Sequence, residues 1–203
     1  MKEFWNERYK ELGYAYGEAP NVYFESCLKK LKPGKLLLPA EGEGRNGVFA
    51  ASLHWIVDAF DISEEGKRKA LLLAEKNKVS LNYTISDFEN IHLPELHYDA
   101  IALIYAHQHE AIRKEVHQKI AASLKPNGHL IIEAFSKANL EYVNKNPKIG
   151  GPKDIAMLYT VEEVQSDFPD FTWEEAYETT TSLNEGEYHV GEGAVVRLFG
   201  KKK

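Results

Sequence analysis

Three glycines follow a short apolar run and give the spacing G-x-G-x-x-G at Gly42, Gly44 and Gly47. Glycine lets a ligand approach the backbone closely, and the N-terminus of a following helix attracts negative or electron-rich groups. Asp61 follows about twenty positions on, as a dinucleotide fingerprint requires. Taken alone, this pattern is compatible with a nicotinamide site, another nucleotide's site, or only a tight turn.

Two acids fall at the ends of the second and third expected strands, Asp61 and Asp87, and Phe88 follows the second of them. A carboxylate at the first place can accept hydrogen bonds from both hydroxyls of a ribose. A carboxylate at the second can accept from an exocyclic amine, and the phenyl ring can stack on a base. Each acid alone is more often a helix cap or a solvated loop end. Together, at the ends of successive strands, they favour a nucleoside pocket.

Two alternative nucleotide sites are weighed against this pocket. A phosphate-binding P-loop is excluded because "GEGRNG" has no G-K-[ST] ending. An NAD-dependent oxidoreductase stays open as the main enzymatic alternative, and it predicts binding of NAD. That class needs a pyrophosphate site and hydride-transfer groups. The chain lacks a Tyr-x-x-x-Lys pair, since His109 and Asn146 stand four places after Tyr105 and Tyr142.

Strands and helices alternate through the middle of the chain, which predicts a parallel sheet covered by helices on both faces. After a polar connection at 144–154 we expect a short helix at 160–168. Two long strands then follow, at 171–183 and 193–202, joined by the glycine-rich "NEGEYHVGEG" and therefore antiparallel. The earlier strands are expected at 35–40, 54–63, 79–88, 98–106 and 129–135, and the helices between them at 46–53, 64–77 and 110–124.

Composition indicates one soluble domain over residues 1–203, with 43% hydrophobic and 28% charged residues. No apolar run is long enough to span a bilayer. The mixed charges of the first residues and the single cysteine, Cys27, favour a cytoplasmic location. A formal charge of −6, from 31 acids and 25 bases, argues against nucleic acid as a partner.

The run "AEGEGRN" (40–46), followed by "FDIS", "SDF", "YDAIALIYAH" and "LKPNGHLIIEAFS", resembles the class I S-adenosylmethionine-dependent methyltransferases. It is most similar to the small bacterial branch related to the thiopurine and tellurite-resistance methyltransferases. "FWNERYKELGYAYGEAPN" (4–21) resembles the N-terminal lid of that branch, and "GGPKDIAMLYTVEEV" its segment after the fifth strand. The resemblance implies a helical lid over 1–30 and an α/β, Rossmann-like core over 35–203. Its sheet would have seven strands, mostly parallel, with an antiparallel C-terminal strand pair.

The resemblance also implies the cofactor, S-adenosylmethionine, and its contacts. The glycine loop would lie beside the methionine part. Its working unit is 40–44, because Gly47 belongs to the first turn of the following helix. The sequence departs from the common pattern at Leu38, where an aspartate is usual. It departs again at Ala40, which replaces a glycine and requires a negative φ. The implied cofactor-binding residues are Trp5, Ala40, Glu41, Gly42, Gly44, Arg45, Asn46, Asp61 (ribose), Ile62 (adenine), Asp87 and Phe88 (adenine amine), and Tyr105 (beneath the sulfonium).

Methyl transfer from a sulfonium depends mainly on alignment and the exclusion of water. A general base is needed only when the acceptor carries a proton that must leave. His107 and His109 have a spacing that two metal ligands can have, but no third ligand is evident, so we predict no metal site. The candidates to surround the acceptor are His107 as base or orienting group, Tyr16 in the lid, His189 in the glycine-rich loop and Arg197 on the last strand.

The sequence therefore predicts an S-adenosylmethionine-dependent methyltransferase that acts on a small molecule, without nucleic acid or membrane as partner. Two alternatives remain open. One is the NAD-dependent oxidoreductase. The other is a cofactor-binding module that has lost catalysis, which would bind the cofactor without turnover on any acceptor.

Overall fold

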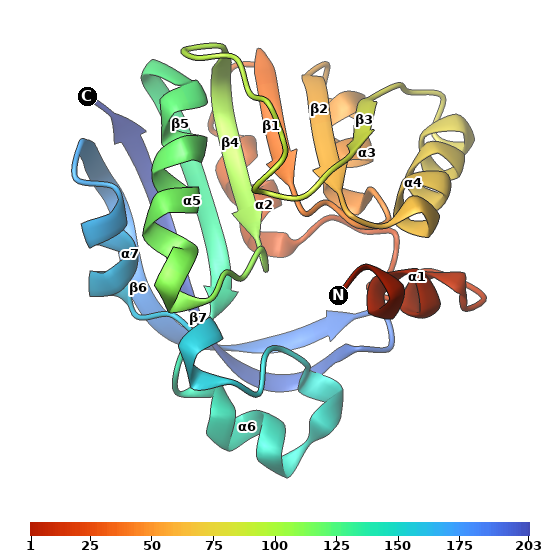
Figure 1. The fold of residues 1–203 in the computed structure, drawn as a ribbon. Helices are drawn as coiled ribbons and strands as arrows, with labels where there is room; N and C mark the ends of the chain where they lie inside the picture. The colour runs from red at the N-terminus through yellow and green to blue at the C-terminus, as the bar shows by residue number, and fades with distance from the viewer.

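A seven-stranded sheet runs through the computed structural model, which describes residues 1–203 (Figure 1). Its strand order is β3-β2-β1-β4-β5-β7-β6. β1 to β5 are mutually parallel, whereas β7 is antiparallel to both β5 and β6, so the predicted Rossmann-like sheet is confirmed. The strands are β1 (Lys35–Pro39), β2 (Ile56–Asp61), β3 (Asn82–Ile85), β4 (Tyr98–Ile104), β5 (Leu124–Phe135), β6 (Phe171–Glu185) and β7 (His189–Lys202).

Helices cover both faces of this sheet, and the apolar run of β1 reflects that cover. Leu36 and Leu38 belong to the core under α2, α3 and α4, whereas Leu37 belongs to the core under α5 and α7. Because alternate residues of a strand face opposite sides, a strand covered on both sides is apolar throughout. The helices are α1 (Lys2–Lys10), α2 (Val22–Leu28), α3 (Arg45–Ser52), α4 (Glu64–Lys76), α5 (Glu110–Ser123), α6 (Asn139–Lys145) and α7 (Val161–Asp167), with short 3-10 turns at Pro147–Ile149 and Ile155–Met157.

α4 begins and ends where its residues favour it. The Ser63 hydroxyl caps the helix by accepting a hydrogen bond from the Gly66 amide at 3.0 Å. Glu64 and Glu65 lie in the first turn and Lys76 in the last, so each charge opposes the end of the helix dipole that it lies near. This start holds the carboxyl end of β2 close to the glycine loop.

The carboxyl ends of β1, β2 and β4 meet at one edge of the sheet, where two distant parts of the chain gather. α1 packs against α4 at this edge, and the hairpin of β6 and β7 runs beneath the sheet toward α1 (Figure 1). The hairpin tip, residues 186–188, is a three-residue turn. Ligands of open α/β sheets bind at this edge, so the two ends of the chain enclose the expected site.

The C-terminal hairpin is longer than predicted, because its strands stay paired as far as Glu185 and His189. His189 therefore lies in a strand and not in a loop. β5 begins at Leu124 rather than 129, since residues 125–128 bulge out between two registered pairs and place Asn127 at φ +65°. β3 is shorter than the alternating sequence indicates, so Asp87 lies two residues beyond its end.

The expectation of a negative φ at Ala40 is wrong. Its φ is +53°, in the left-handed region that favours glycine. A left-handed conformation costs an L-residue about 1–2 kcal/mol, and the loop imposes it between the end of β1 and Glu41.

Ala40→Gly is therefore expected to raise the free energy of unfolding by about 0.5–1 kcal/mol, because relief of strain exceeds the added freedom of the unfolded chain. Urea denaturation measures this change. Ala51→Gly, at a right-handed position in α3, is the matched control and should lower stability by up to about 1 kcal/mol. A loss of stability in both variants would contradict strain at Ala40.

Candidate active site

The glycine loop forms a tight turn at the carboxyl end of β1. Gly42 and Gly44 have φ of +59° and +87°, and Gly44 is the N-cap of α3. Gly47 is the third residue of α3, as expected. A Cβ on Gly44 would lie 2.5 Å from the Cβ of Ala70, so this glycine also permits the close packing of the loop on α4. The loop is thus fixed by packing as well as by conformation.

Polar side chains hold the loop to the helix that follows. Glu41 Oε1 accepts from the Gly47 amide at 2.7 Å, and Asn46 Oδ1 accepts from the Asn21 amide at 2.9 Å. Burial raises the pKa of Glu41 to about 7, although the Gly47 amide and Arg45 act against this shift. Glu43 accepts from the Ala15 amide and from Lys69. The loop and the N-terminal segment therefore form one hydrogen-bonded unit.

Asp61 lies at the end of β2 with its side chain turned to the loop. It accepts hydrogen bonds from the amides of Gly42 at 3.1 Å and Ser63 at 2.9 Å. Each carboxylate oxygen receives one of these bonds, which leaves a lone pair on each for a further donor. Burial raises the pKa of Asp61, and the bonds from Ser63 and Gly42 oppose that rise.

α1 covers this corner of the site. The hydroxyl of Tyr9 lies where a Cβ of Gly42 would point, at 2.6 Å from that position, and Trp5 stacks on Tyr9 with ring centroids 5.5 Å apart. Tyr83, in β3, donates to the Gly42 carbonyl at 2.6 Å. Trp5 thus packs on the residue that covers Gly42, a link that the sequence did not indicate.

Asp87 and Phe88 make local contacts in the turn after β3. Asp87 accepts from the amide and the side chain of Asn90, and the backbone bond from Asn90 lowers its pKa. Phe88 packs edge-on against Phe60, at 5.2 Å between centroids, and joins the core beneath α5. Ile62 is half-buried beside Asp61. Their predicted contacts with adenine stay predictions.

On the other side of the loop, Tyr105 and Arg197 share one buried acid, Glu133. The Tyr105 hydroxyl donates to Glu133 Oε1 at 2.9 Å, and Arg197 Nε donates to Oε2 at 2.5 Å. Asn21 Nδ2 donates to Oε1 as well. Arg197 is thus already paired with an acid that is 1% exposed, which argues against the predicted capture of an anionic acceptor by Arg197.

His189 and Tyr16 meet beside this group. His189 Nδ1 lies 2.9 Å from Glu185 Oε2, and the same oxygen accepts from Arg45 at 3.0 Å. The Tyr16 and Tyr105 rings lie 4.5 and 4.6 Å from the imidazole, centroid to centroid. Burial lowers the pKa of His189 more than Glu185 raises it, so the ring is neutral near pH 7. The structure therefore brings together Tyr16, Tyr105 and His189 from three distant segments.

His107 packs against Phe135, which also contacts His189, and it has no free ring nitrogen. Nδ1 lies 2.7 Å from the Met157 carbonyl, to which it donates, and Nε2 accepts from the Phe135 amide at 3.1 Å. This geometry argues against the predicted role of His107 as base. His109 caps α5 by accepting from the Ala111 amide.

Burial lowers the pKa of His107 to about 4, so this ring should make stability depend on pH. The unfolded chain takes up a proton near pH 6.5 and the folded chain does not, so stability falls as pH drops from about 6.5 towards 4. We expect His107→Gln to flatten this decline, which amounts to roughly 3 kcal/mol. Urea denaturation across pH measures it; His109→Gln, an exposed cap, should keep the wild-type slope.

Sequence reasoning missed Glu133, Glu185 and Tyr9. Glu133 is the one charged side chain in the apolar run "LIIEAF", and such a residue in a buried strand calls for a partner. Glu185 and His189 flank the "GEY" turn and pair directly across it, which becomes visible only once the turn length is known. No sequence signal set Tyr9 apart from other lid residues.

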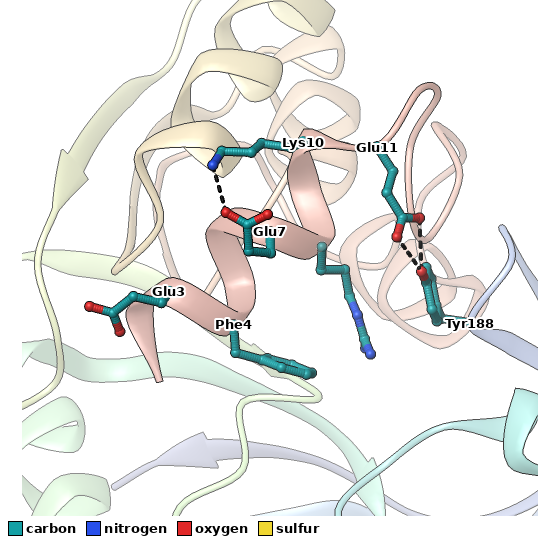
Figure 2. A pocket seen from close by; sticks show the side chains of 7 residues that line it. Glu3, Phe4, Glu7, Lys10, Glu11 and Tyr188 are labelled. Atoms are coloured by element: carbon teal, nitrogen blue, oxygen red, sulfur yellow. Dashed lines mark hydrogen bonds and ion pairs between the residues drawn. The ribbon is translucent and has the colours of Figure 1, made fainter.

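The hairpin tip contacts the N-terminal segment over the site. Tyr188 donates to the Glu11 carboxylate at 2.8 Å, and the Glu187 amide donates to the Ala15 carbonyl at 3.0 Å. Arg8 lies over the Tyr188 ring, 4.2 Å from its centroid, and donates to the Tyr16 hydroxyl. An open hollow of about 700 Å³ lies outside this contact, on α1 and Tyr188 (Figure 2).

None of the helices is both long and apolar enough to cross a membrane.

Comparison with known proteins bears on the loop and the fold. Residues 40–132 match the family described as a methyltransferase domain. A search of curated proteins found no significant match. The structure is similar to TehB from Haemophilus influenzae (TM-score 0.72, 16% identity, 100% of this chain and 67% of that chain).

Two other solved structures are similar over the whole chain. One comes from work on the conversion of a disulfide bond into a thioacetal group during echinomycin biosynthesis (TM-score 0.79, 14% identity, 92% of that chain). The other is an S-adenosylmethionine-dependent methyltransferase from Anabaena variabilis (TM-score 0.71, 15% identity, 93% of that chain). The family match and the fold imply S-adenosylmethionine as cofactor. Residues 40–132 thus match a methyltransferase domain, and the chain as a whole has the fold of S-adenosylmethionine-dependent methyltransferases.

Proposed function

We propose that this enzyme transfers the methyl group of S-adenosylmethionine to a small-molecule acceptor held beside His189. One observation carries the choice of a small acceptor: the group of Tyr16, Tyr105 and His189 lies beneath the N-terminal segment and the hairpin tip, with His189 only 5% exposed. A polymer would have to displace both covers. The formal charge of −6 also opposes nucleic acid.

The residues present fit the cofactor. Asp61 keeps one free lone pair on each oxygen, as two ribose hydroxyls require. The loop carries no side chain of its own at Gly42 and Gly44, and Tyr9, which comes from the lid, lies over Gly42. When bound, S-adenosylmethionine supplies an activated methyl group. We assign the loop, residues 40–46, to its methionine part, Asp61 to the ribose, and Ile62, Asp87 and Phe88 to the adenine.

The remaining residues of the site position the reacting groups and enclose them. Tyr105 is held by Glu133 at the end of β4, so its ring has one orientation at the edge where we place the sulfonium. The N-terminal segment, with Trp5 and Tyr16, excludes water. Such enclosure raises the rate by fixing the reacting atoms in line. The whole chain acts as one domain in this proposal.

Titration calorimetry and thermal denaturation with S-adenosylmethionine, S-adenosylhomocysteine and NAD test the cofactor. A ligand at a hundred times its Kd adds about 2.7 kcal/mol to the folded state, so the first two should raise Tm by several degrees. Stabilisation by NAD alone contradicts the proposal.

The acceptor is tested by following S-adenosylhomocysteine release with a panel of small molecules and, in parallel, with protein and RNA from a cell extract. We expect release with small molecules only. Release confined to polymers contradicts the small acceptor, and tight cofactor binding without release on any acceptor identifies a non-catalytic module.

A further inference from the structure

We infer that His189 and Glu185 form a proton-accepting dyad, and that the acceptor is a phenol or enol whose hydroxyl gives up its proton to Nε2 of His189. This inference rests on the proposed function and deepens it. His189 would be the catalytic residue, because it touches the acceptor, and Glu185 a positioning residue that acts through it.

The two residues are built into the hairpin as a directly opposed cross-strand pair. Glu185 ends β6 and His189 begins β7, with only the three-residue turn between them. The contact of 2.9 Å joins Glu185 Oε2 to Nδ1 of the ring, and both side chains are about nine-tenths buried. A pair set by backbone register does not depend on flexible surface side chains for its geometry.

This contact determines which nitrogen carries the proton. Against the effect of burial, hydrogen bonds from His189 and Arg45 lower the pKa of Glu185 to about 2, so the carboxylate is ionised and can only accept. Nδ1 must therefore donate, and in the neutral ring Nε2 keeps its lone pair. No protein group hydrogen-bonds to Nε2, in contrast to His107, whose two nitrogens are both occupied.

The edge of the ring that carries Nε2 faces Gly150, not a side chain. A Cβ at this position would lie 2.8 Å from Cδ2 and 3.3 Å from Nε2, so any side chain here would collide with that edge of the ring. Gly150 also has φ +76°, a conformation that disfavours any side chain. Glycine at position 150 thus keeps side chains away from the basic nitrogen.

The walls around the imidazole are aromatic, which favours a flat acceptor. The rings of Tyr16, Tyr105 and Phe135 lie 4.5, 4.6 and 5.2 Å from it, centroid to centroid. Stacked and edge-on contacts with aromatic rings stabilise planar molecules. A phenol also has a proton that a neutral imidazole can accept as the oxygen becomes methylated.

The charges close to the dyad are balanced. Glu185 and Glu133 face Arg45 and Arg197, which pair with them one to one. In the step, an oxygen electron pair forms the new bond to carbon and the carbon–sulfur bond breaks with its pair on sulfur. The acceptor proton moves to Nε2. The resulting imidazolium lies against the ionised Glu185, which stabilises it without taking the proton.

The tautomer of His189 can be measured without any acceptor. Long-range ¹H–¹⁵N spectra of the full-length, ¹⁵N-labelled protein at pH 7.5 report each ring nitrogen, and His189→Gln identifies the signals. We expect a protonated Nδ1 and an unprotonated Nε2. Glu185→Gln should retain this tautomer, because its amide oxygen can accept, whereas Glu185→Leu should shift the proton to Nε2. A proton on Nε2 in the wild type overturns the inference.

His117 is the internal control for these spectra. Its Nδ1 lies 2.9 Å from Asp167 between α5 and α7, in a different part of the core, so its signals should not change in either Glu185 variant. A change at His117 together with His189 would mean that the fold was disturbed and that Glu185 has no specific effect on the dyad.

Rates on simple phenols and alkanethiols test the acceptor class. His189→Gln should lower S-adenosylhomocysteine release with phenols by 10²-fold or more, and with thiols much less at high pH, where they ionise unaided. Methylation of thiols alone, or phenol rates unchanged in His189→Gln, overturns the inference. Failure of S-adenosylmethionine to bind the wild type overturns the proposed function instead.

Discussion

Gly44→Ala lowers the free energy of unfolding by about 3 kcal/mol, because the added methyl group combines backbone strain with a steric clash. Gly44 has φ +87°, so alanine pays for a left-handed backbone. Its Cβ would also lie 2.5 Å from Ala70 Cβ and 2.8 Å from Ala70 Cα. Because a backbone atom cannot rotate away, α4 must move. Urea denaturation measures the loss.

Gly13→Ala separates the two contributions. Gly13 has nearly the same φ, +83°, but nothing lies within 4 Å of an added Cβ. It should therefore cost only the conformational part, about 1 kcal/mol. Equal losses in the two variants would mean that the contact between the glycine loop and α4 contributes nothing, which would contradict the packing described above.

Asp61→Asn weakens binding of S-adenosylmethionine about 100-fold, the largest change in affinity that we expect. Each hydrogen bond to a charged group contributes about 1.5–3 kcal/mol, so two ribose hydroxyls that donate to a carboxylate are together worth at least about 3 kcal/mol. The amide keeps one acceptor oxygen and places a donor opposite the Gly42 or Ser63 amide. Titration calorimetry with S-adenosylmethionine measures the affinity.

Asp58→Asn is the matched control on the same strand. Asp58 accepts from Asn82 and from the Tyr98 hydroxyl, three residues before the carboxyl end of β2. It should alter stability, since these bonds are weakened. Because Asp58 lies away from the carboxyl edge of the sheet, the Kd for S-adenosylmethionine should change less than about twofold, or about 0.4 kcal/mol. If both variants bind like the wild type, Asp61 has no part in holding the ribose.

The sheet could be predicted because its signals are local. "LLL" and "AIALI" are apolar on both faces, as buried parallel strands must be, and Ser63 with two glutamates marks the start of α4. The antiparallel C-terminal pair followed from the glycine-rich connection between two long strands, and the count of seven strands from a resemblance to a family. The alternating pattern of 79–88 overstated β3, which lies at the edge of the sheet and pairs over four residues only.

Side-chain roles were harder to predict, since they depend on contacts between distant segments. His107 follows β4, where the motif suggests catalysis, yet its neighbours Met157 and Phe135 supply bonds to both nitrogens. Arg197 forms an ion pair with Glu133, 64 positions away in the sequence. Ala40 shows the reverse case: a local rule against left-handed alanine is overridden because the surrounding loop fixes the backbone.

The contact between the hairpin tip and the N-terminal segment has a kinetic consequence. Tyr188 with Glu11, and the Glu187 amide with the Ala15 carbonyl, join residues near the two ends of the chain above His189. In the proposed function, an acceptor that reaches the imidazole, and a product that leaves it, pass this contact. The rate at which the contact opens would then set an upper limit on kcat, however fast the methyl group moves.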